Sequence, residues 1–362
     1  MTKALPPVAT IGILGGGQLG RMLAVAASRL GLKTHIFEPA PEPPAGQVAD
    51  MITTAAYDDK VALVQFAKSV DVITYEFENI PTAALDTLEK LRPIHPNRRA
   101  LATSQDRLTE KEFLNSLGLT TAPYADVQTL DDLHGAIAAL GLPAILKTRR
   151  MGYDGKGQVR LNAPEDAQAA FDAMAGSPAV LEGFVDFTRE VSVIGARSQD
   201  GQVVCFDPGE NVHRDGILHS TTVPAALSTM QRTDAALLAG RILNALDYVG
   251  VMGVELFVTS AKSPVAMVVN EIAPRVHNSG HWTQNGCVVD QFEQHIRAVA
   301  GWPLGDGHRH ADVEMENLIG NDVDRIPQLA AEGNTAIHLY GKASAREGRK
   351  MGHINRIIKA AP

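Results

Sequence analysis

The first hundred residues alternate short β-rich runs with amphipathic stretches, and this order restricts the fold more than any other feature of the sequence. The β-rich runs cover residues 9–14, 34–37 and 70–75, and the amphipathic stretches cover residues 19–30, 62–68 and 82–91. Strands that alternate with helices in this way pair in parallel, because each crossover helix returns the chain to the same end of the sheet. We therefore predict an N-terminal α/β domain built on a parallel sheet.

The remaining sequence divides into two further units of α+β character. The second unit is predicted to contain helices at 104–117, 131–140 and from 164, with strands at 144–147, 180–182 and 190–194. The third is predicted to contain helices at 228–246 and 288–300, with strands at 251–258, 265–271 and a terminal strand at 336–340. We place the domain limits at 1–103, 104–185 and 186–362.

The composition argues against a nucleic-acid-binding, membrane-binding or disulfide-rich protein. The chain has 362 residues and a net charge of −8, which argues against a general nucleic-acid or membrane-surface partner. Its two cysteines, Cys205 and Cys287, form neither a disulfide framework nor a metal-binding spacing. No apolar run has the length of a membrane span, so we expect a cytoplasmic protein that acts on small molecules.

A glycine-rich loop joins the first predicted strand to the first predicted helix. Gly15-Gly16-Gly17-Gln18-Leu19-Gly20 matches the dinucleotide-binding fingerprint, and Glu38 ends the next strand, where such proteins place a ribose-binding acid. However, backbone N–H groups at a helix N-terminus attract any phosphate, and a tight turn needs the same glycines. The loop alone leaves an NAD-dependent dehydrogenase open.

A second glycine-rich segment follows the predicted strand that ends at Lys147. It reads Gly152-Tyr153-Asp154-Gly155-Lys156-Gly157-Gln158, and Arg149 and Arg150 precede it. Its N–H groups can fold over a polyphosphate, while Lys147 supplies a fixed positive charge. A plain glycine hairpin needs no flanking basic residues, so we predict a flap that covers phosphates.

Two glutamates interrupt apolar strands near the end of the third unit. Glu255 lies within 251–258 and Glu271 ends 265–271. A carboxylate in such a run is costly unless it is paired or bound to a metal. If the strands are antiparallel neighbours, Glu255, Glu271 and Asn270 can hold magnesium that bridges nucleotide phosphates. A buried ion pair with a lysine or arginine is the competing interpretation.

A dense polar segment follows the second of these strands. Arg275 offers a planar fork for a carboxylate-like or phosphate-like anion, and His277, Asn278 and Ser279 add hydrogen-bonding groups. A polar surface loop does not require this density of groups after a buried strand, so we predict a reaction site. Near the C-terminus, a basic run from Lys342 to His353 fits either a solvated face or a phosphate clamp.

Together these segments resemble the ATP-grasp ligases, and among them the 5-(carboxyamino)imidazole ribonucleotide synthases of purine biosynthesis. The resemblance covers nearly the whole chain and rests on Gly15–Met22, Tyr75–Ile80, Gln105–Lys111, Gly152–Gln158, Val269–Thr283 and Gly348–His353. It implies an ATP-grasp fold with an N-terminal Rossmann-like preATP-grasp domain, a small lid domain and a C-terminal ATP-grasp domain, with ATP held between the last two. One departure is Met151, where glycine is expected before the flap.

The resemblance also implies roles for individual residues. The implied ATP contacts are Arg107, Lys147, Gly152, Tyr153, Asp154, Gly155, Lys156, Gly157, Gln158, Glu182, Gly183, Phe184, Val185, Glu190, His213, Asn270 and Glu271. The implied magnesium ligands are Glu255 and Glu271, and the implied ribonucleotide contacts are Glu76, Tyr153, Asp154, Lys156, Arg275, Lys342 and Arg349. The implied catalytic residues are Arg275, His277 and Asn278, which would hold bicarbonate, and Asp154, which would orient or deprotonate the amine.

The implied reaction is the carboxylation of 5-aminoimidazole ribonucleotide with ATP and bicarbonate, through carboxyphosphate, releasing ADP and phosphate. Magnesium is the implied metal cofactor, and a homodimer is expected. Three alternatives remain: an ATP-grasp ligase that uses formate on a purine-pathway ribonucleotide, an NAD-dependent dehydrogenase built on the first glycine loop, and a non-catalytic nucleotide-binding module.

Overall fold

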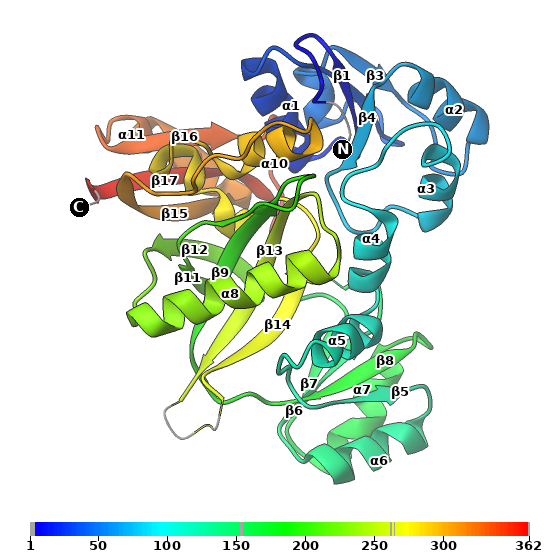
Figure 1. Ribbon diagram of the computed structural model, residues 1–362. Coiled ribbons are helices and arrows are strands. Elements are labelled where there is room, and N and C mark those ends of the chain that lie inside the picture. The colour runs from blue at the N-terminus through cyan, green and yellow to red at the C-terminus, as the bar shows by residue number, and fades with distance from the viewer. Residues whose placement is uncertain (1–3, 153–154, 261–262, 264, 361–362) are drawn as a thin grey trace.

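The computed structural model describes residues 4–152, 155–260, 263 and 265–360 and contains three β-sheets (Figure 1). In Figure 1 the N-terminal unit lies at the upper right, the second unit at the bottom, and the largest sheet between them and to the left. The mixed α/β and α+β organisation predicted from the sequence is confirmed.

The N-terminal unit is a parallel sheet of order β3-β2-β1-β4. Strand β1 pairs in parallel with both β2 and β4, as the alternating pattern predicts. Its elements are β1 (Thr10–Leu14), α1 (Gln18–Arg29), β2 (Lys33–Phe37), η1 (Pro44–Gln47), β3 (Met51–Thr53), α2 (Lys60–Lys68), β4 (Val72–Tyr75), α3 (Thr82–Leu88) and α4 (Arg98–Ser104).

The second unit is an antiparallel sheet of order β5-β8-β6-β7 with three α-helices among its described residues. Its elements are α5 (Arg107–Ser116), β5 (Tyr124–Val127), α6 (Leu130–Leu140), β6 (Ala144–Thr148), β7 (Gln158–Leu161), η2 (Pro164–Asp166), α7 (Ala167–Ala173) and β8 (Ala179–Gly183). The helix predicted over 104–117 is present as α5, but it begins at Arg107 rather than at residue 104. Asp106 sets this start, because its carboxylate accepts the backbone N–H of Leu108 at 3.1 Å and caps α5.

The third unit is a nine-stranded sheet, ordered β14-β13-β9-β11-β12-β15-β17-β16 with β10 beside β9. Its first elements are β9 (Phe187–Arg197), β10 (Val203–Cys205), β11 (Gly209–Arg214), β12 (Ile217–Val223), α8 (Thr229–Ala245), β13 (Gly250–Thr259), β14 (Met267–Ala273), η3 (Asn278–Gly280) and α9 (Thr283–Gly286). Its last elements are α10 (Gln291–Val299), β15 (Ala311–Ile319), η4 (Gly320–Arg325), α11 (Ile326–Ala330), β16 (Thr335–Leu339) and β17 (Lys350–Ala360).

The strand predicted over 336–340, which corresponds to β16, is not the last strand of the chain. Strand β17 follows it and lies between β15 and β16. His353 and Asn355 of this strand are buried although they are polar. The sequence of the strand therefore lacks the alternation of apolar and polar residues by which a strand is recognised. Part of the basic run is therefore a strand of the sheet.

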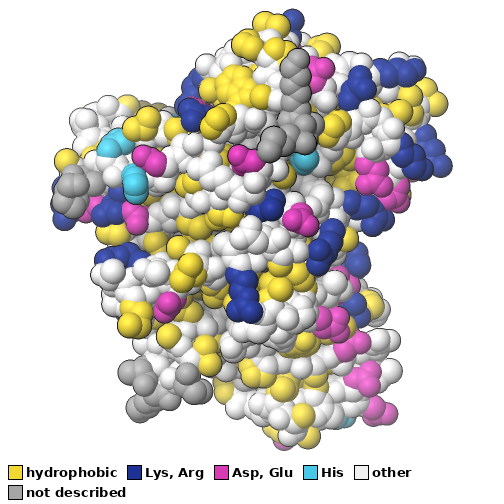
Figure 2. Space-filling view, viewed as in Figure 1, with side chains coloured by type: hydrophobic (Ala, Val, Ile, Leu, Met, Phe, Trp, Pro, Cys, Tyr) yellow, Lys and Arg dark blue, Asp and Glu magenta, His cyan; other side chains and the backbone are white. Residues whose placement is uncertain are grey.

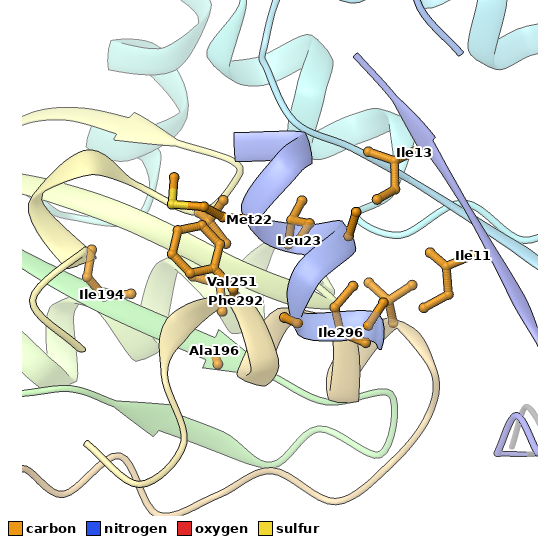
Figure 3. Close-up of a cluster of buried hydrophobic side chains, with 14 of the residues drawn as sticks. Ile11, Ile13, Met22, Leu23, Ile194, Ala196, Val251, Phe292 and Ile296 are labelled. Atoms are coloured by element: carbon orange, nitrogen blue, oxygen red, sulfur yellow. The ribbon is translucent and has the colours of Figure 1, made fainter. Parts of the chain in front are cut away.

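The N-terminal unit and the largest sheet share one hydrophobic core. Ile11 and Leu23 of the first unit belong to the same buried cluster as Val251, Phe292 and Ile296 of the third (Figure 3). Helix α1 packs against α10 within this cluster, so these two units form one packed body. The second unit instead has a separate core, formed by residues that include Val127, Leu133, Leu146, Leu161 and Leu181.

Three further findings concern the surface charges, the helices and the cysteines. In Figure 2, basic and acidic side chains are interspersed over the face viewed in Figure 1. Within the described residues, every helix is too short or too polar to cross a bilayer. Cys205 and Cys287 are both free thiols, as their spacing predicts.

Acid should destabilise this packed body through His295, which lies buried between the first and third units. Its Nδ1 accepts the N–H of Val251 at 3.0 Å, and its Nε2 lies 2.8 Å from Thr74 Oγ1. Burial, and then the charge of His95, lower the pKa of His295 to about 3. The unfolded chain therefore takes up this proton first as the pH falls. The free energy of unfolding should therefore fall by about 1.4 kcal/mol for each pH unit below about 6.5. This fall should continue until the pH reaches the pKa of His295 in the folded protein.

Urea unfolding measured between about pH 7.5 and pH 5 tests this expectation. His295→Gln should flatten the pH dependence of the unfolding free energy. His308→Gln is the matched control, because the His308 side chain is 87% exposed. Equal slopes for the wild type and His295→Gln would show that His295 does not carry this effect.

Candidate active site

Two carboxylates face each other across strands β13 and β14. The strands are antiparallel, and Glu255 pairs with Glu271 in the register. The register shifts after Glu255, so Asn270 is an extra residue of β14 beside the Glu255–Glu271 pair. Asn270 Nδ2 donates to Glu255 Oε2 at 3.2 Å. Burial, and then the charge of Glu271, raise the pKa of Glu255 to about 7. A cation between these carboxylates would favour their ionised form.

This oxygen set suits magnesium. Magnesium usually takes one or two protein carboxylates and completes its shell with water and substrate phosphates. Within the described residues there is no group of three or more His, Cys, Asp or Glu side chains placed to hold a metal, so a fully protein-built cage is not present there. Glu255, Glu271 and the amide oxygen of Asn270 provide the smaller set that a phosphate-bound magnesium needs.

The second unit brings positive charge to these carboxylates. Arg107, at the start of α5, lies 3.3 Å from Glu271 Oε2. Lys147 of β6 and Lys111 of α5 approach Glu182 at 2.8 and 3.1 Å. Burial favours the protonated form of Glu182, but the two lysines outweigh it and hold its pKa at about 2. The ion pair with Glu182 thus holds the predicted phosphate-binding lysine in place.

Two other predicted nucleotide contacts lie on neighbouring strands of the large sheet. His213 Nδ1 of β11 lies 2.9 Å from Glu190 Oε2 of β9. Burial lowers the pKa of His213, but hydrogen bonding to Glu190 and the charges of Glu190 and Glu255 raise it overall. The predicted hinge residues Phe184 and Val185 line a pocket of about 390 Å³. A larger hollow of about 690 Å³ lies over α8 and β10, away from the predicted site residues.

The predicted flap is described only in part. Gly152, Gly155, Lys156, Gly157 and Gln158 lie between β6 and the start of β7, whereas Tyr153 and Asp154 lie outside the described residues. Met151, which stands where glycine is expected, has a φ of 64°. This left-handed region favours glycine, and a side chain there costs on the order of 1 kcal/mol.

Arg275 is held by a carboxylate from the N-terminal unit. Its Nε donates to Glu78 Oε2, and its Nη2 donates to Glu78 Oε1 at 3.1 Å. Arg275 lowers the pKa of Glu78 to about 2, against the opposing effect of burial. The guanidinium therefore carries its full charge at the end of β14.

His277 is neutral in this environment. Burial, and then the charges of Arg275 and Lys350, lower its pKa to about 3. The backbone N–H of Ser279 points at His277 Nδ1 at 3.4 Å, and the Ser279 hydroxyl lies 2.8 Å from the same atom. Because Nδ1 accepts the backbone N–H, the ring proton lies on Nε2, which is 3.5 Å from Glu255 Oε1. His277 can therefore donate a hydrogen bond, but Arg275 supplies the positive charge.

Asn278 is fixed by a reciprocal pair of amide hydrogen bonds. Its Nδ2 donates to Asn317 Oδ1 at 2.9 Å, and Asn317 Nδ2 returns a bond to Asn278 Oδ1 at 2.8 Å. Asn317 also donates to the backbone oxygen of Leu218 at 2.9 Å, which ties the pair to β12. The orientation of Asn278 is thus set by a neighbouring strand.

The first glycine loop binds the protein's own carboxylates. Glu76 accepts the backbone N–H groups of Gly17 and Gly20, the latter at 2.6 Å, and Glu38 accepts that of Gly16 at 2.8 Å. A Cβ on Gly17 would lie 2.6 Å from Glu76 Oε1, so glycine is required for this close approach. Because carboxylates occupy the N–H groups that would bind a pyrophosphate, the dehydrogenase alternative loses its structural basis.

The C-terminal basic run approaches the same region. Lys342 Nζ donates to the backbone oxygen of Lys350 at 2.6 Å, and Arg349 Nη1 donates to that of Ser344 at 3.0 Å. Gln47 of η1 donates to the oxygen of Gly341 at 2.8 Å, which joins this loop to the N-terminal unit. Ion pairs and electrostatic interactions link Lys147, Glu182, Arg107, Glu271 and Glu255 in turn, from the second unit to strands β13 and β14.

Comparison with known proteins accounts for this arrangement. Three family models match: the ribonucleotide synthetase preATP-grasp domain over residues 8–105, the ATP-grasp domain over 112–292 and the phosphoribosylaminoimidazole carboxylase C-terminal domain over 314–361. The N5-carboxyaminoimidazole ribonucleotide synthase of Brucella melitensis is 55% identical over 98% of both chains. This chain belongs to the N5-carboxyaminoimidazole ribonucleotide synthase family.

Solved structures of N5-carboxyaminoimidazole ribonucleotide synthases agree with this assignment. An N5-carboxyaminoimidazole synthetase of Staphylococcus aureus, complexed with ADP, is 39% identical with a TM-score of 0.93, covering 98% of this chain and 94% of that one. An Aspergillus clavatus synthase, in complex with ADP and 5-aminoimidazole ribonucleotide, is 32% identical with a TM-score of 0.91, covering 97% and 94%. The predicted ATP-grasp fold with a preATP-grasp domain is thereby confirmed.

Sequence reasoning missed three polar residues at the site of this family member: Glu78, Lys111 and Asn317. Glu78 lies only two residues after Glu76, in a segment that supports the resemblance, so the signal was present but unassigned. Lys111 and Asn317 are 2% and 0% exposed, and a buried polar side chain in a helix or apolar strand becomes meaningful only when its partner is known.

Proposed function

We propose that this chain is an ATP-dependent carbon–nitrogen ligase that carboxylates the amine of 5-aminoimidazole ribonucleotide in purine biosynthesis, with bicarbonate as the carboxyl source. One observation carries the proposal. The facing carboxylates Glu255 and Glu271 and the charged Arg275 lie along one strand pair and the turn that follows it. A site of this kind can hold nucleotide phosphates and a small anion side by side.

The proposed chemistry has two steps. A bicarbonate oxygen attacks the γ-phosphorus of ATP, and the bond to the β-phosphate oxygen breaks, giving carboxyphosphate and ADP. The exocyclic amine then attacks the carboxyl carbon and displaces phosphate, or carboxyphosphate first breaks down to phosphate and carbon dioxide, whose carbon the amine attacks. In both routes the amine loses a proton. The protein's contribution is to orient the reactants and neutralise growing negative charge.

Each part of the site has a proposed task in this reaction. Arg275 would bind bicarbonate and stabilise charge on carboxyphosphate, while neutral His277 and Asn278 would donate hydrogen bonds. Magnesium held by Glu255 and Glu271 would neutralise charge on the ATP phosphates. For the amine, Asp154 stays our candidate to orient or deprotonate it.

Substrate contacts complete the proposal. The nucleotide would contact Arg107, Lys147, the hinge 182–185, Glu190 and His213, with the flap 152–158 over its phosphates. The ribonucleotide would contact Glu76, Tyr153, Asp154, Lys156, Arg275, Lys342 and Arg349. We further propose domain limits at 1–103, 104–185 and 186–362, a homodimer, and a cytoplasmic location.

ADP release tests the proposed function. The assay contains ATP, magnesium and bicarbonate, with and without 5-aminoimidazole ribonucleotide, and we expect rapid ADP release only in the complete mixture. Formate in place of bicarbonate should give none, which separates this reaction from that of a formate-using ligase. Ribonucleotide-independent release at the full rate, or release with formate, would contradict the proposal.

Glu76→Ala should weaken use of the ribonucleotide. A carboxylate oxygen can accept more than one hydrogen bond, so Glu76 can bind sugar hydroxyls while it holds the glycine loop. Losing these acceptors should lower kcat/KM for the ribonucleotide, by an amount equivalent to roughly 1 to 3 kcal/mol of activation free energy. Glu38→Ala is the matched control, since Glu38 also accepts N–H groups of this loop, at 2.8 Å from Gly16 and 2.9 Å from Ala40. Equal ribonucleotide KM values for the two variants would remove Glu76 from the substrate site.

A further inference from the structure

Glu78 joins the N-terminal unit to the proposed bicarbonate site. It lies in the loop after β4, whereas Arg275 follows β14 of the large sheet. The two side chains form a two-point contact, in which Nε and Nη2 of Arg275 donate to the two oxygens of one carboxylate. Both are largely buried, with side-chain exposures of 25% for Glu78 and 17% for Arg275. This geometry fixes the plane of the guanidinium as well as its position.

The contact leaves part of the guanidinium available. Arg275 also donates from Nη1 to the backbone oxygen of Val276 at 3.2 Å. Three of its five N–H groups are then used, and among the described residues no acceptor is recorded for the other two. These two groups, one on each terminal nitrogen, can bind a planar anion such as bicarbonate.

Other carboxylates compete for the same arginine. The charges of Glu271 and Glu76 both act on Arg275, in addition to that of Glu78. If Arg275 turned toward Glu271, it would neutralise a proposed magnesium ligand and leave the bicarbonate position. The two-point contact with Glu78 therefore selects one of several possible partners.

The loop that carries Glu78 is itself fixed. Gln105 donates from Nε2 to the backbone oxygens of Glu78 and Ile80, at 2.8 and 2.7 Å. The same loop begins at Glu76, whose carboxylate is held by the glycine loop. Glu78 thus presents its carboxylate from a rigid backbone, which suits a residue that must orient another side chain.

We infer that Glu78 is a positioning residue for the carboxylation, which orients Arg275 toward bicarbonate and keeps it from pairing with Glu271. This inference rests on the proposed function. Glu78 itself would not touch the reacting atoms, so its loss should affect the use of bicarbonate far more than the use of ATP.

Steady-state kinetics of Glu78→Gln and Glu78→Asp test the inference. Glu78→Gln should lower kcat/KM for bicarbonate by about 10- to 100-fold, the order expected when a reactant is misplaced, while the KM for ATP stays within about twofold. Glu78→Asp keeps the charge on the same loop and should recover part of the loss. Arg29→Gln is the matched control, because Arg29 also joins these units, at 3.0 Å from Asp290 and 2.6 Å from Glu293, outside the site.

The outcomes separate the inference from the proposed function. If Glu78→Gln matches Arg29→Gln in every kinetic constant, or weakens ATP and bicarbonate use equally, the inference is wrong. If the wild type gives no ribonucleotide-dependent ADP release, the proposed function is wrong, and ¹⁵N NMR of the arginine Nε–H groups still decides the positioning. One Nε–H signal should then disappear in Arg275→Lys and shift in Glu78→Gln; an unshifted signal overturns the inference.

Discussion

Glu271→Gln and Glu255→Gln are each expected to reduce ribonucleotide-dependent ADP release to background while leaving the fold intact. Each substitution removes a negative charge from the facing pair on β13 and β14 but keeps the size of the side chain. Without both carboxylates, magnesium would not be held against the phosphates, and a metal typically contributes several kcal/mol of charge stabilisation. The rate should therefore fall on the order of 10³-fold or more.

Glu314→Gln is the matched control for this pair. Glu314 lies on β15 of the same sheet, 42% exposed and 3.5 Å from Arg356, and we place it in no part of the site. Its rate should stay near that of the wild type. Near-normal activity of both Glu255→Gln and Glu271→Gln at saturating magnesium would exclude them as metal ligands.

Arg275→Ala is expected to lower kcat/KM for bicarbonate. The activation free energy should rise by about 2 to 4 kcal/mol, the range for losing one fixed charge-stabilising donor. This corresponds to roughly 30- to 1,000-fold. Because the substitution also leaves the largely buried Glu78 without its partner, some loss of stability should accompany it. Arg275→Lys keeps the positive charge but loses the planar fork, so an intermediate rate is expected.

Arg309→Ala controls for the loss of a paired arginine. Arg309 is 19% exposed and pairs with Asp207 and with Asp312, the latter at 3.0 Å, and neither aspartate is a predicted site residue. Its melting temperature should fall as that of Arg275→Ala does, while its kcat/KM for bicarbonate stays unchanged. Equal kinetic losses in the two variants would mean that Arg275 acts only on stability.

Much of the fold could be predicted from local sequence patterns. The parallel N-terminal sheet follows from alternating strands and helices, and strands β13 and β14 are visible as apolar runs. The start of α5 at Arg107 was missed, although Asp106 is of a residue type that commonly caps a helix. Strand β17 was missed because its buried residues His353 and Asn355 are polar and bind partners distant in the chain, such as Tyr340 and the backbone oxygen of His281.

The site could be predicted less completely, because its electrostatics depend on partners far apart in the chain. The sequence places Arg275 near an anion site, but only the structure shows that Glu78, 197 positions away, binds two of its nitrogens. Likewise, the glycine loop resembles a dinucleotide site until Glu38 and Glu76 are seen on its N–H groups. Pairings of this kind depend on tertiary structure, and local motifs do not encode them.

The separate core of the second unit has a consequence for chimaeric proteins. The side chains of residues 124–183 that form its core pack among themselves, whereas the N-terminal unit and the large sheet contribute to one shared cluster. Exchanging residues 124–183 for the matching segment of a relative would keep every cluster whole. A crossover at residue 104 would instead combine one hydrophobic core from two proteins. Ile11 and Leu23 would then pack in the same cluster as residues of the relative at positions 292 and 296, which have not evolved to fit them. Recombination in this fold should therefore be tolerated at the two ends of residues 124–183 and rejected near residue 104.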